Sequence, residues 1–426
     1  MNHDNATRAV LEGHLDSVGG HLHNGVIPFW FARVEDTEFG GFLTNFDARG
    51  TELPTPEKYV NTQCRLIWWF STLCRHFSHL EPARRLATRG VEFLLKHFWD
   101  SKHGGFFWKV NRDGSRLDDA KIVYGESFCI YALSEYFLAT RDERGLEYAS
   151  RTFDLLQKHC ADTRHGGYYE NVRADWSPES GGFAGGDRKG LDTHMHLMEA
   201  FTTLYAASGQ EVHRRKLMEV VELIRAKMID PASGCGLNQF DLAWNPVPAI
   251  AIKRTWNGER MGESPAQPTD TTSYGHNIEL AWLMQRAVET AGADLAVYKP
   301  TLRRLLDHGA DHGVDWELGG IYRDGLRATG KAIVLEKEFW QHSESLVGFL
   351  GGYALFGERR FLDAFDVIWR FVREHMIIQD VGEWRTLLSR EGDPLDANIG
   401  NPWKVSYHTG RAMLECYTRL KTLLNG

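Results

Sequence analysis

The side chains best suited to chemistry lie near the starts of six predicted helices that are far apart in the chain. Each start combines histidine, arginine or carboxylate groups with aromatic rings. The candidates are Arg65, Trp68, Tyr124, Glu126, Asp192, His194, His196, Glu199, His276, Glu279, Trp340, His342, Glu344, Trp403, Tyr407, His408 and Arg411. A lone histidine in a helix is usually structural, but this recurrence favours one shared site.

The spacing of the histidines indicates which of them face such a site. His194 and His196 are two residues apart, about 200° around a helix, so they cannot both face the same way. We favour His196, because Glu199 follows three residues later on the same helical face and can orient its ring. His276 and Glu279 have the same spacing.

The aromatic and basic candidates allow two interpretations each. Trp340 and Trp403 are either core residues or flat walls for a sugar ring, because aromatic faces beside polar groups commonly hold sugars. Arg65 either pairs with a carboxylate or stabilises an anion. The sequence leaves both questions open.

This set of side chains suits proton transfer at carbon. Imidazoles titrate near neutral pH, so two of them on opposite sides of a carbon can act as base and acid. Removing a proton beside a carbonyl gives an enediolate, which an arginine and helix N-termini would stabilise. Return of the proton to the other face gives epimerisation, and return to the neighbouring carbon gives aldose–ketose isomerisation. We expect no metal, because no H-E-x-x-H or other ligand spacing occurs.

A degenerate repeat provides the elements that would gather these helix starts. Aspartate is followed by glycine within a few residues at Asp36, Asp100, Asp162, Asp230, Asp315 and Asp380. Alternating stretches with turns follow at 41–50, 106–114 and 321–325, and they predict short β-hairpins whose glycines adopt positive φ. We interpret these repeats as scaffold that starts each inner helix at one rim.

Between the hairpins the apolar period becomes helical. The pattern predicts twelve helices, near 5–24, 62–76, 83–97, 121–139, 143–159, 187–207, 211–227, 274–290, 297–310, 338–355, 358–375 and 404–423. Five tight pairs, with the two end helices as a sixth pair, predict an all-α (α/α)6 barrel with short β-hairpins at one mouth. We expect residues 1–426 to form a single catalytic domain, with the helices that follow the hairpins on the inside.

Composition narrows the class of partner. A net charge of −8 without long like-charge runs argues against nucleic acid and membrane surfaces, and favours a neutral small molecule. The six cysteines include no C-x-x-C pair, so we expect reduced thiols. No signal-like N-terminus occurs, nor a run of the roughly 20 apolar residues that a membrane span needs. These features predict a cytoplasmic protein and leave open whether it is a monomer or a homodimer.

Four ordered segments carry a resemblance to a known family. They are 192–200 (DTHMHLMEA), 273–279 (SYGHNIE), 339–348 (FWQHSESLVG) and 403–411 (WKVSYHTGR). Together they resemble the N-acylglucosamine 2-epimerase superfamily over essentially the whole chain. Within it they are most similar to cellobiose 2-epimerases and mannose 2-epimerases.

The resemblance implies an (α/α)6 barrel that removes and returns the C2 proton of an open-chain sugar without metal or cofactor. It assigns the acid/base pair to His276 and His408, and stabilisation of the enediolate to Arg65. His196 would assist ring opening or orient the substrate, and Glu279 would tune His276. The side chains expected to bind substrate are Trp340, Trp403, Tyr124, Asp192, His194, Trp68, Glu344 and Arg411.

Four positions depart from the cellobiose epimerase pattern. Asp192 stands in place of Asn, His342 in place of Gln, Ser406 in place of Pro and Thr409 in place of Asn. These changes bear on substrate choice more than on chemistry.

One repeat interval is also longer than the others. Asp230 to Asp315 spans 85 residues, against 62 to 68 elsewhere, and it includes the polar segment 254–272. We expect this segment to form an extended loop at the mouth. Such a loop would narrow the pocket and favour a monosaccharide such as mannose or glucose over cellobiose.

Three other functions stay open. A ketose isomerase of the same superfamily would convert mannose to fructose, but such enzymes tend to have one histidine near His194 and His196, so the pair favours an epimerase. A glycosidase would need two carboxylates roughly 5–9 Å apart. Candidates for that pair are Glu126, Glu279, Glu338 and Glu344. A non-catalytic module that binds sugar or protein can have the same fold.

Overall fold

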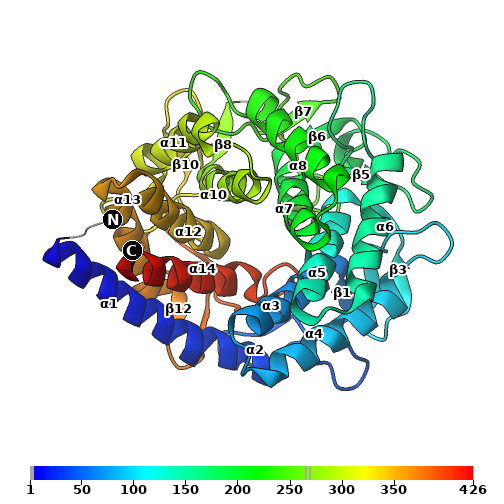
Figure 1. Ribbon diagram of the computed structural model, residues 1–426, viewed down its shortest axis with the longest axis horizontal. Helices are drawn as coiled ribbons and strands as arrows, with labels where there is room; N and C mark the ends of the chain where they lie inside the picture. Colours follow the sequence, from blue (N-terminus) through cyan, green and yellow to red (C-terminus); the bar gives the residue numbers. More distant parts are fainter. Residues whose placement is uncertain (1–3, 264–265, 268–269, 426) are drawn as a thin grey trace.

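Six inner helices form a closed ring. The computed structural model describes residues 4–263, 266–267 and 270–425. The inner helices are α3 (Val60–His76), α5 (Val123–Thr140), α7 (Leu191–Ser208), α10 (Tyr274–Thr290), α12 (Phe339–Phe356) and α14 (Ser406–Asn425). Each packs against the next, and α14 packs against α3, so the ring closes (Figure 1).

Six outer helices surround this ring. They are α1 (Asn5–His21), α4 (Glu81–Phe93), α6 (Glu143–His159), α8 (Glu211–Leu223), α11 (Lys299–His308) and α13 (Arg359–Phe371). Each of the last five packs against the inner helix that precedes it in the chain, and α1 packs against α14. The predicted (α/α)6 barrel, including the pairing of the two end helices, is therefore confirmed.

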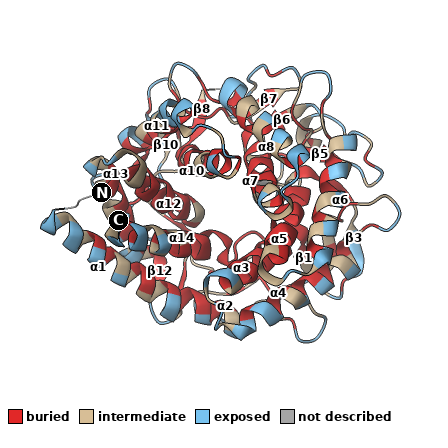
Figure 2. Cartoon of the chain, viewed as in Figure 1, coloured by how far each residue is buried: buried red, intermediate tan, exposed pale blue. Residues whose placement is uncertain are grey.

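Apolar patterning explains which helices are inside. On α13 the buried residues Phe361, Phe365, Ile368 and Trp369 recur at helical spacing, which gives one apolar face. On α12 nearly every residue from Phe339 to Tyr353 is buried, as expected of a helix enclosed on all sides. Figure 2 shows the same contrast between the buried inner ring and the partly exposed outer ring.

The helix bounds differ from the predicted ones by only a few residues, with two additions. The chain continues from α1 through a π-helical turn at Leu22–Val26 into α2 (Ile27–Arg33). A short helix, α9 (Trp256–Met261), lies inside the long polar loop. Similar π-helical turns end four outer helices, at Leu94–Phe98, Ile224–Met228, Gly309–Gly313 and Val372–Met376. Two 3₁₀ turns occur at Gly182–Ala184 and Leu295–Val297.

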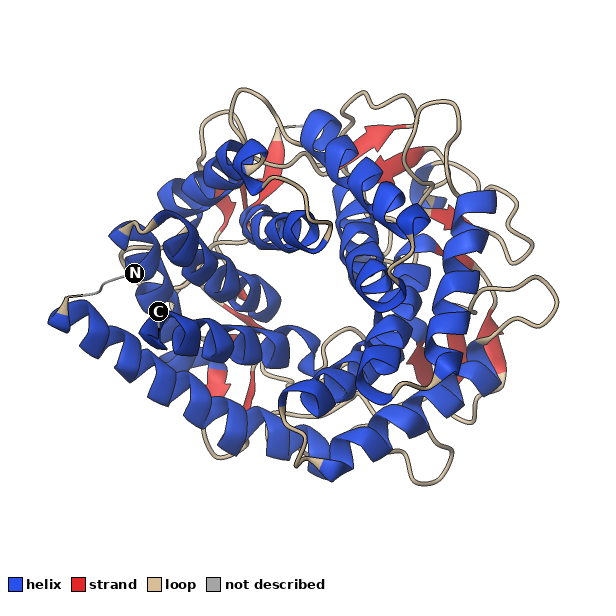
Figure 3. Ribbon diagram, in the orientation of Figure 1, coloured by secondary structure: helices blue, strands red, loops and turns tan. Residues whose placement is uncertain are grey.

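Short antiparallel strands connect neighbouring repeats (Figure 3). The three-stranded sheets are β1 (Glu57–Tyr59), β2 (Lys109–Asn111) and β3 (Arg116–Asp118); β8 (Thr271–Ser273), β9 (Asp324–Leu326) and β10 (Ala332–Val334); and β11 (Lys337–Glu338), β14 (Leu387–Leu388) and β15 (Pro394–Asp396). The two-stranded sheets pair β4 (Lys121–Ile122) with β5 (Asn171–Val172), β6 (Arg188–Gly190) with β7 (Gln239–Asp241), and β12 (Ile377–Ile378) with β13 (Glu383–Trp384). Strands β1, β4, β6, β8 and β11 end immediately before inner helices and pair with the hairpin region of the next repeat. This pairing places the inner-helix starts at one rim.

The hairpin prediction is confirmed in two places and modified in a third. Residues 106–114 contain β2 and its turn, and 321–325 lead into β9. At 41–50 the described chain forms isolated bridges, Glu35 with Phe42 and Phe46 with Glu52, instead of named strands. The glycine pairs have the expected positive φ, as at Gly40 (85°) and Gly41 (67°).

Four of the six repeat aspartates, all in described segments, hold a buried lysine that stands two residues before an inner helix. In the second repeat Asp100 also accepts hydrogen bonds from the backbone N–H groups of Lys102 and His103, which closes the glycine turn. The Asp–Lys pairs are Asp36–Lys58 (2.8 Å), Asp100–Lys121 (3.1 Å), Asp162–Lys189 (2.7 Å) and Asp315–Lys337 (2.9 Å). In the fourth repeat Thr272 takes the lysine position, and Asp230 pairs with Arg327 at 2.9 Å. These contacts support the interpretation of the repeat as scaffold.

Two further predictions concern membranes and thiols. Among the described residues, no helix is long and apolar enough to cross a bilayer. All six cysteines lie in described segments and are free.

Candidate active site

A cavity of about 460 Å³ opens at the rim where the inner helices begin. Ten of its lining side chains occupy the second, third or sixth position of an inner helix. These are Arg65 of α3, Tyr124 of α5, Asp192, Thr193 and His196 of α7, His276 and Glu279 of α10, Trp340 and Gln341 of α12, and His408 of α14. The ring therefore brings together candidates that are far apart in the sequence.

His276 and His408 flank Trp340 in this cavity. The Trp340 ring centroid lies 4.6 Å from that of His276 and 6.0 Å from that of His408. Burial lowers the pKa of His276, and burial together with Arg65 and Arg411 lowers the pKa of His408 well below its usual value. Both imidazoles are therefore inclined to be neutral, and a neutral imidazole can act as a base.

Glu344 orients the ring of His408. The Nδ1–H of His408 donates to Glu344 Oε1 at 2.6 Å, and His408 lines the cavity. Because Nδ1 is occupied, Nε2 is the ring atom left for a substrate. Glu344 itself is fully buried behind the cavity wall.

His196 lies between two carboxylates. Its Nδ1 is 2.9 Å from Glu199 Oε2, and its Nε2 is 3.3 Å from Asp192 Oδ1. Burial alone would lower the pKa of His196, but the hydrogen bonds to Asp192 and Glu199 raise it to about 9. His196 is therefore an imidazolium at neutral pH, in contrast to His276 and His408.

Arg411 is the centre of a buried charge network behind the cavity. Its guanidinium donates to Glu279 Oε1 at 2.8 Å, lies 2.8 Å from Glu344 Oε1 and also contacts Glu199. Burial and the neighbouring Glu344 raise the pKa of Glu279 to about 8. Three carboxylates around one guanidinium leave an excess of negative charge, so a proton on Glu279 is favoured.

Glu279, Glu344 and His408 are also the group in the described residues whose ligand atoms are close enough to hold a metal, all within 4.8 Å. The Arg411 guanidinium contacts both carboxylates and supplies the positive charge that a metal would bring. The two carboxylates are therefore better explained as partners of the Arg411 guanidinium than as ligands of a metal ion. The expected absence of a metal stays a prediction, which activity after dialysis against a chelator would test.

Arg65 of α3 lines the cavity beside α14. Its NH2 donates to the Tyr124 hydroxyl at 2.6 Å and its NH1 donates to the Trp403 carbonyl at 2.9 Å. The guanidinium lies over the rings of Phe128 and Tyr407, at 4.5 and 4.8 Å from their centroids. No carboxylate of the described residues forms an ion pair with Arg65 at these distances, so its charge is available for an anion in the cavity.

Four of the residues expected to bind substrate do not line the cavity. They are His194, Trp68, Glu344 and Arg411, all of which are buried. Trp68 stacks on Tyr131 with centroids 5.3 Å apart and packs edge-on against Tyr407. We therefore revise these four from substrate contacts to supporting residues.

His194 has a structural role that recurs around the ring. Its Nε2 accepts from the backbone N–H of Tyr168 at 3.0 Å, and its Nδ1–H donates to the Gly190 carbonyl at 2.8 Å. His194 is the fourth residue of α7. In five of the described inner helices the fourth residue accepts a hydrogen bond from the backbone N–H of the residue that follows the repeat turn. The five are Gln63, Glu126, His194, Asn277 and His342. His342, which departs from the family pattern, is therefore scaffold as well.

Several lining residues were not anticipated from the sequence. Glu170 lies beside α7, where its Oε1 accepts from the backbone N–H of Gly190 at 2.5 Å, and burial raises its pKa to about 7. The cavity lining also includes Asn171, Asn238, Gln239, Arg323 and Asp324. These residues lie on or next to the short strands, which carry no repeated chemical motif that would have marked them.

The loop predicted at the mouth lies across the cavity. The Nε1–H of Trp256 in this loop donates to Glu338 Oε1 at 3.0 Å, and the ring centroids of Trp256 and Trp403 are 6.1 Å apart. Ion pairs attach the loop to other repeats, as in Arg254–Asp118 (2.8 Å), Glu259–Lys109 (3.1 Å) and Arg260–Glu338 (3.2 Å). Residues 264–265 and 268–269 of this loop lie outside the described residues.

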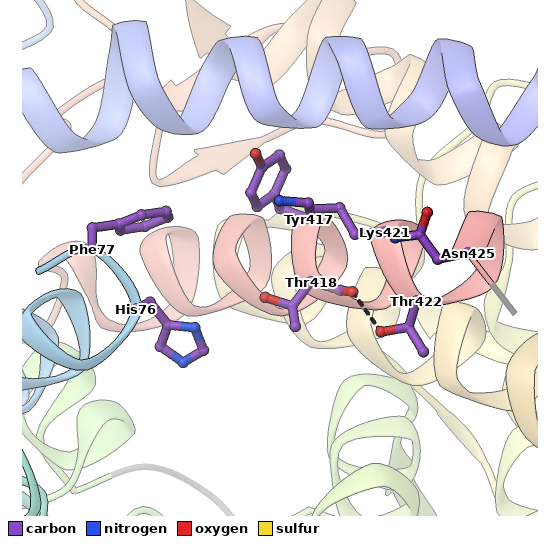
Figure 4. A pocket seen from close by; sticks show the side chains of 7 residues that line it. All are labelled: His76, Phe77, Tyr417, Thr418, Lys421, Thr422 and Asn425. Atoms are coloured by element: carbon purple, nitrogen blue, oxygen red, sulfur yellow. Dashed lines mark hydrogen bonds between the residues drawn. The ribbon is translucent and has the colours of Figure 1, made fainter.

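A second cavity, of about 510 Å³, lies at the opposite ends of α3 and α14 (Figure 4). It is lined by His76, Phe77, Tyr417, Thr418, Lys421, Thr422 and Asn425. None of these residues was predicted to act in chemistry, and the lining includes no carboxylate. The cavity at the start of the inner helices is therefore the candidate active site.

Comparisons with known proteins agree on the family and the fold. The family model described as N-acylglucosamine 2-epimerase matches residues 40–412. A cellobiose 2-epimerase of Bacteroides fragilis is 28% identical over 401 residues, covering 92% of this chain and 96% of that protein. A D-mannose isomerase of Marinomonas mediterranea is 24% identical over 424 residues, covering 98% of each chain. The solved cellobiose 2-epimerase of Spirochaeta thermophila superposes with a TM-score of 0.86 at 30% identity, covering 99% of this chain and all of that one.

Proposed function

The chain belongs to the N-acylglucosamine 2-epimerase family, and on that premise we propose that it interconverts the C2 epimers of an aldose, with D-mannose and D-glucose as the preferred pair. Its relatives are named cellobiose 2-epimerase, D-mannose isomerase and N-acylglucosamine 2-epimerase, so the chain is a carbohydrate epimerase or isomerase. The observation that carries the choice of reaction is the pair of histidines, His276 and His408, which line one cavity and both lie beside the ring of Trp340.

The two histidines have unequal tendencies to hold a proton. His276 Nε2 lies 3.7 Å from the Asp192 carboxylate, which favours a proton there. His408 has its Nδ1–H on Glu344 and is pushed further toward the neutral form. Both rings are inclined to be neutral in the free site, and the Asp192 carboxylate makes His276 the one that gains a proton more readily. In the reacting complex His408 is thus the neutral base that takes the C2 proton, and the protonated His276 returns one to the opposite face. The reverse reaction exchanges these roles.

The charge that develops on the substrate has a partner. Removal of the C2 proton leaves an enediolate, and the Arg65 guanidinium lies on the cavity wall with no carboxylate neutralising it among the described residues. The N-termini of the inner helices also point to this rim, and their partial positive charge stabilises an anion. Trp340 and Trp403 line the same cavity and supply flat faces for a sugar.

Product analysis by NMR in D2O tests this function directly. With mannose, an epimerase gives glucose that carries deuterium at C2, and His276→Asn or His408→Asn should each abolish that product. A chief product of fructose with label at C1 would replace this proposal by an aldose–ketose isomerase. Sugar binding without any turnover would indicate a binding module.

Two alternatives are less well supported by the site. The first histidine of the His-Met-His motif, His194, does not reach the cavity, so it gives no direct contact that distinguishes an epimerase from a ketose isomerase. For a glycosidase, Glu126 binds the Phe106 backbone, Glu279 and Glu344 contact Arg411, and Glu338 contacts Trp256. Of these four only Glu279 and Glu338 line the cavity, and each of them is already paired with an arginine.

The loop at the mouth supports a preference for a monosaccharide. Trp256 and Thr255 line the outer cavity, where the second ring of a disaccharide would extend. We expect kcat/KM for mannose to exceed that for cellobiose, and Trp256→Ala to reduce this preference. Equal kcat/KM values for the two sugars in the wild type would contradict it.

A further inference from the structure

Asp192 is a carboxylate in contact with both the cavity and two histidines. It is the second residue of α7, and its Oδ1 lies 3.3 Å from His196 Nε2 and 3.7 Å from His276 Nε2. The Asp192 side chain is 45% exposed because it faces the cavity, whereas that of His196 is 3% exposed. Asp192 can therefore touch a bound sugar and a buried imidazolium at the same time.

His196 is placed to hold a proton and to give it up only toward the cavity. Glu199 occupies its Nδ1 and is in turn fixed by Tyr407 and Arg411. The other ring nitrogen, Nε2, points to Asp192 at a distance longer than an ideal hydrogen bond. A substrate oxygen that approaches Asp192 can therefore also approach the Nε2–H of His196.

Titratable and charged groups from several elements surround His196, Asp192 and His276. For His196 they are Asp192 and Glu199 on its own helix, His276 and Glu279 of α10, Glu344 of α12 and His408 of α14. For Asp192 they are Arg65 of α3, Tyr124 of α5, Glu170 before β5 and His276 of α10, besides His196 on its own helix. For His276 they are Asp192, His196, Glu338 and Glu344. Burial would raise the pKa of Asp192, but His196, His276 and Arg65 lower it to about 2, so the carboxylate is ionised.

An epimerase must open its substrate before it can act at C2. The C2 proton is acidic only beside a carbonyl, and a closed sugar ring has none. The reaction needs a group that takes the proton of the anomeric hydroxyl and another that gives a proton to the ring oxygen. His276 and His408 are engaged at C2, so different residues must do this.

We propose that Asp192 and His196 form the ring-opening pair of this enzyme, an inference that rests on the proposed function. The Asp192 carboxylate takes the proton from the anomeric O1–H, the C1–O5 bond breaks as C1=O1 forms, and His196 Nε2–H protonates O5. The proton on Asp192 then passes back to His196 across their contact, which restores the ion pair. Atoms and charges balance without any further reagent.

This role is specific to the carboxylate in this chain. An asparagine at this position, as in the cellobiose epimerase pattern, has the same shape but cannot accept the O1 proton. The replacement of that asparagine by Asp192 in this chain therefore supplies a base for ring opening. Asp192→Asn is accordingly the sharpest variant, because it removes the base and keeps the size of the side chain.

Mutarotation separates ring opening from chemistry at C2. The measurement is the rate at which the enzyme interconverts the anomers of mannose and of 2-deoxyglucose, whose C2 has no epimer, followed by polarimetry or NMR. The wild type should accelerate both, and Asp192→Asn should lose about 10²-fold of that acceleration. His276→Asn should keep mutarotation while losing epimerisation. Asp187→Asn, an exposed aspartate bound to Arg188, is the matched control and should keep both activities.

The pH dependence gives a readout that a purely structural role would not move. Since the pKa of His196 is raised to about 9, mutarotation by the wild type should be present below that value and lost as pH rises through it. Removing one of its two carboxylates lowers the histidine pKa, by roughly one unit or more. In Asp192→Asn the loss of the remaining mutarotation with rising pH should therefore begin at a lower pH than in the wild type. In Asp192→Glu it should begin at the wild-type pH again.

The outcomes distinguish this proposal from the function on which it rests. Accelerated mutarotation without any epimerisation would remove the proposed function and keep the ring-opening pair. Two results would overturn the ring-opening pair. One is epimerisation without accelerated mutarotation. The other is an Asp192→Asn variant whose mutarotation rate and alkaline limb are those of the wild type.

Discussion

His408 shows how one hydrogen bond and its surroundings prepare a base. Burial, with Arg65 and Arg411 nearby, lowers its pKa well below 6.5. A base must be neutral, and a histidine with a lowered pKa becomes charged only when the pH falls through that lowered value. We predict that the acid limb of kcat/KM for epimerisation lies below pH 6.5. Initial rates over the pH range in which the protein stays folded would measure it, and a limb at or above 6.5 would contradict the assignment of His408.

Glu344 is expected to act through His408 and not through substrate. It accepts from His408 Nδ1 at 2.6 Å and lies 2.8 Å from Arg411, yet it does not line the cavity. In Glu344→Gln the ring of His408 loses its carboxyl partner, so we predict that kcat falls by about 10²-fold while KM changes little. Steady-state kinetics would show this split.

Two comparisons make that test specific. Glu317→Gln alters a glutamate that is 75% exposed and bound to Arg390, so it should leave both constants unchanged. A rise in KM with an unchanged kcat for Glu344→Gln would instead support its original assignment as a substrate contact.

Among the elements, the fourth residue in each of five described inner helices ties that helix to the preceding turn. His194 accepts from the Tyr168 backbone N–H, as Gln63 accepts from that of Phe42 at 2.9 Å. An amide oxygen can thus do the same work, and we predict that His194→Gln keeps nearly wild-type epimerisation. His194→Leu leaves a buried N–H without a partner and should reduce the free energy of unfolding by about 1–3 kcal/mol. Loss of activity in a well-folded His194→Gln would return His194 to the active site.

The buried lysines of the repeat should matter for stability. Lys189 is fully buried and contacts Asp162 at 2.7 Å, so Lys189→Met leaves a buried carboxylate without its partner. We predict a loss of about 3–5 kcal/mol in the free energy of unfolding, measured by denaturant titration. Lys216→Met removes an exposed pair with Glu219 and should cost less than about 1 kcal/mol. Equal effects of the two variants would argue against a scaffold role for the repeat.

Local patterns explain which elements could be predicted from the sequence. The 3.6-residue apolar period of α13 and the glycine pairs of the turns are properties of neighbouring residues, so the helices and turns were predictable. It was harder to predict which face of each inner helix points to the cavity. Helix α12, for example, is buried all round, so its apolar residues do not distinguish one face from another. That is why His196 was placed correctly through its Glu199 spacing, whereas Glu344, Arg411 and Trp68 were expected in the cavity.

The outer cavity could not be predicted for a different reason. Glu170 and Asn238 reach the site only because short strands pair between repeats, and such pairing is a long-range property. Likewise, the partner of His408 is Glu344 on another helix, 64 residues away, so no local spacing could reveal it.

At the scale of the whole molecule, the ring is closed by contacts between the two ends of the chain. The outer helix α1 packs on α14, which carries His408 near its start. Trp369 of α13 donates to Ser17 of α1 at 2.9 Å, and Trp384 of β13 donates to His21 at 2.8 Å. The position of His408 therefore depends on residues at the opposite end of the sequence.

This closure leads to a prediction about cooperativity. If residues 1–426 form a single domain, the full chain should unfold in one thermal transition, and two resolved transitions would contradict that assignment. Deleting residues 1–21 removes α1, including the buried Leu11 and Val18, and exposes apolar faces of α13 and α14. We predict that the shortened chain unfolds at a clearly lower temperature and loses epimerisation, because α14 is no longer held in the ring. Glu12→Ala, which removes an exposed pair with Arg8 on the same helix, should leave both properties unchanged. A shortened chain with wild-type stability and activity would show that the ring does not need α1 to close.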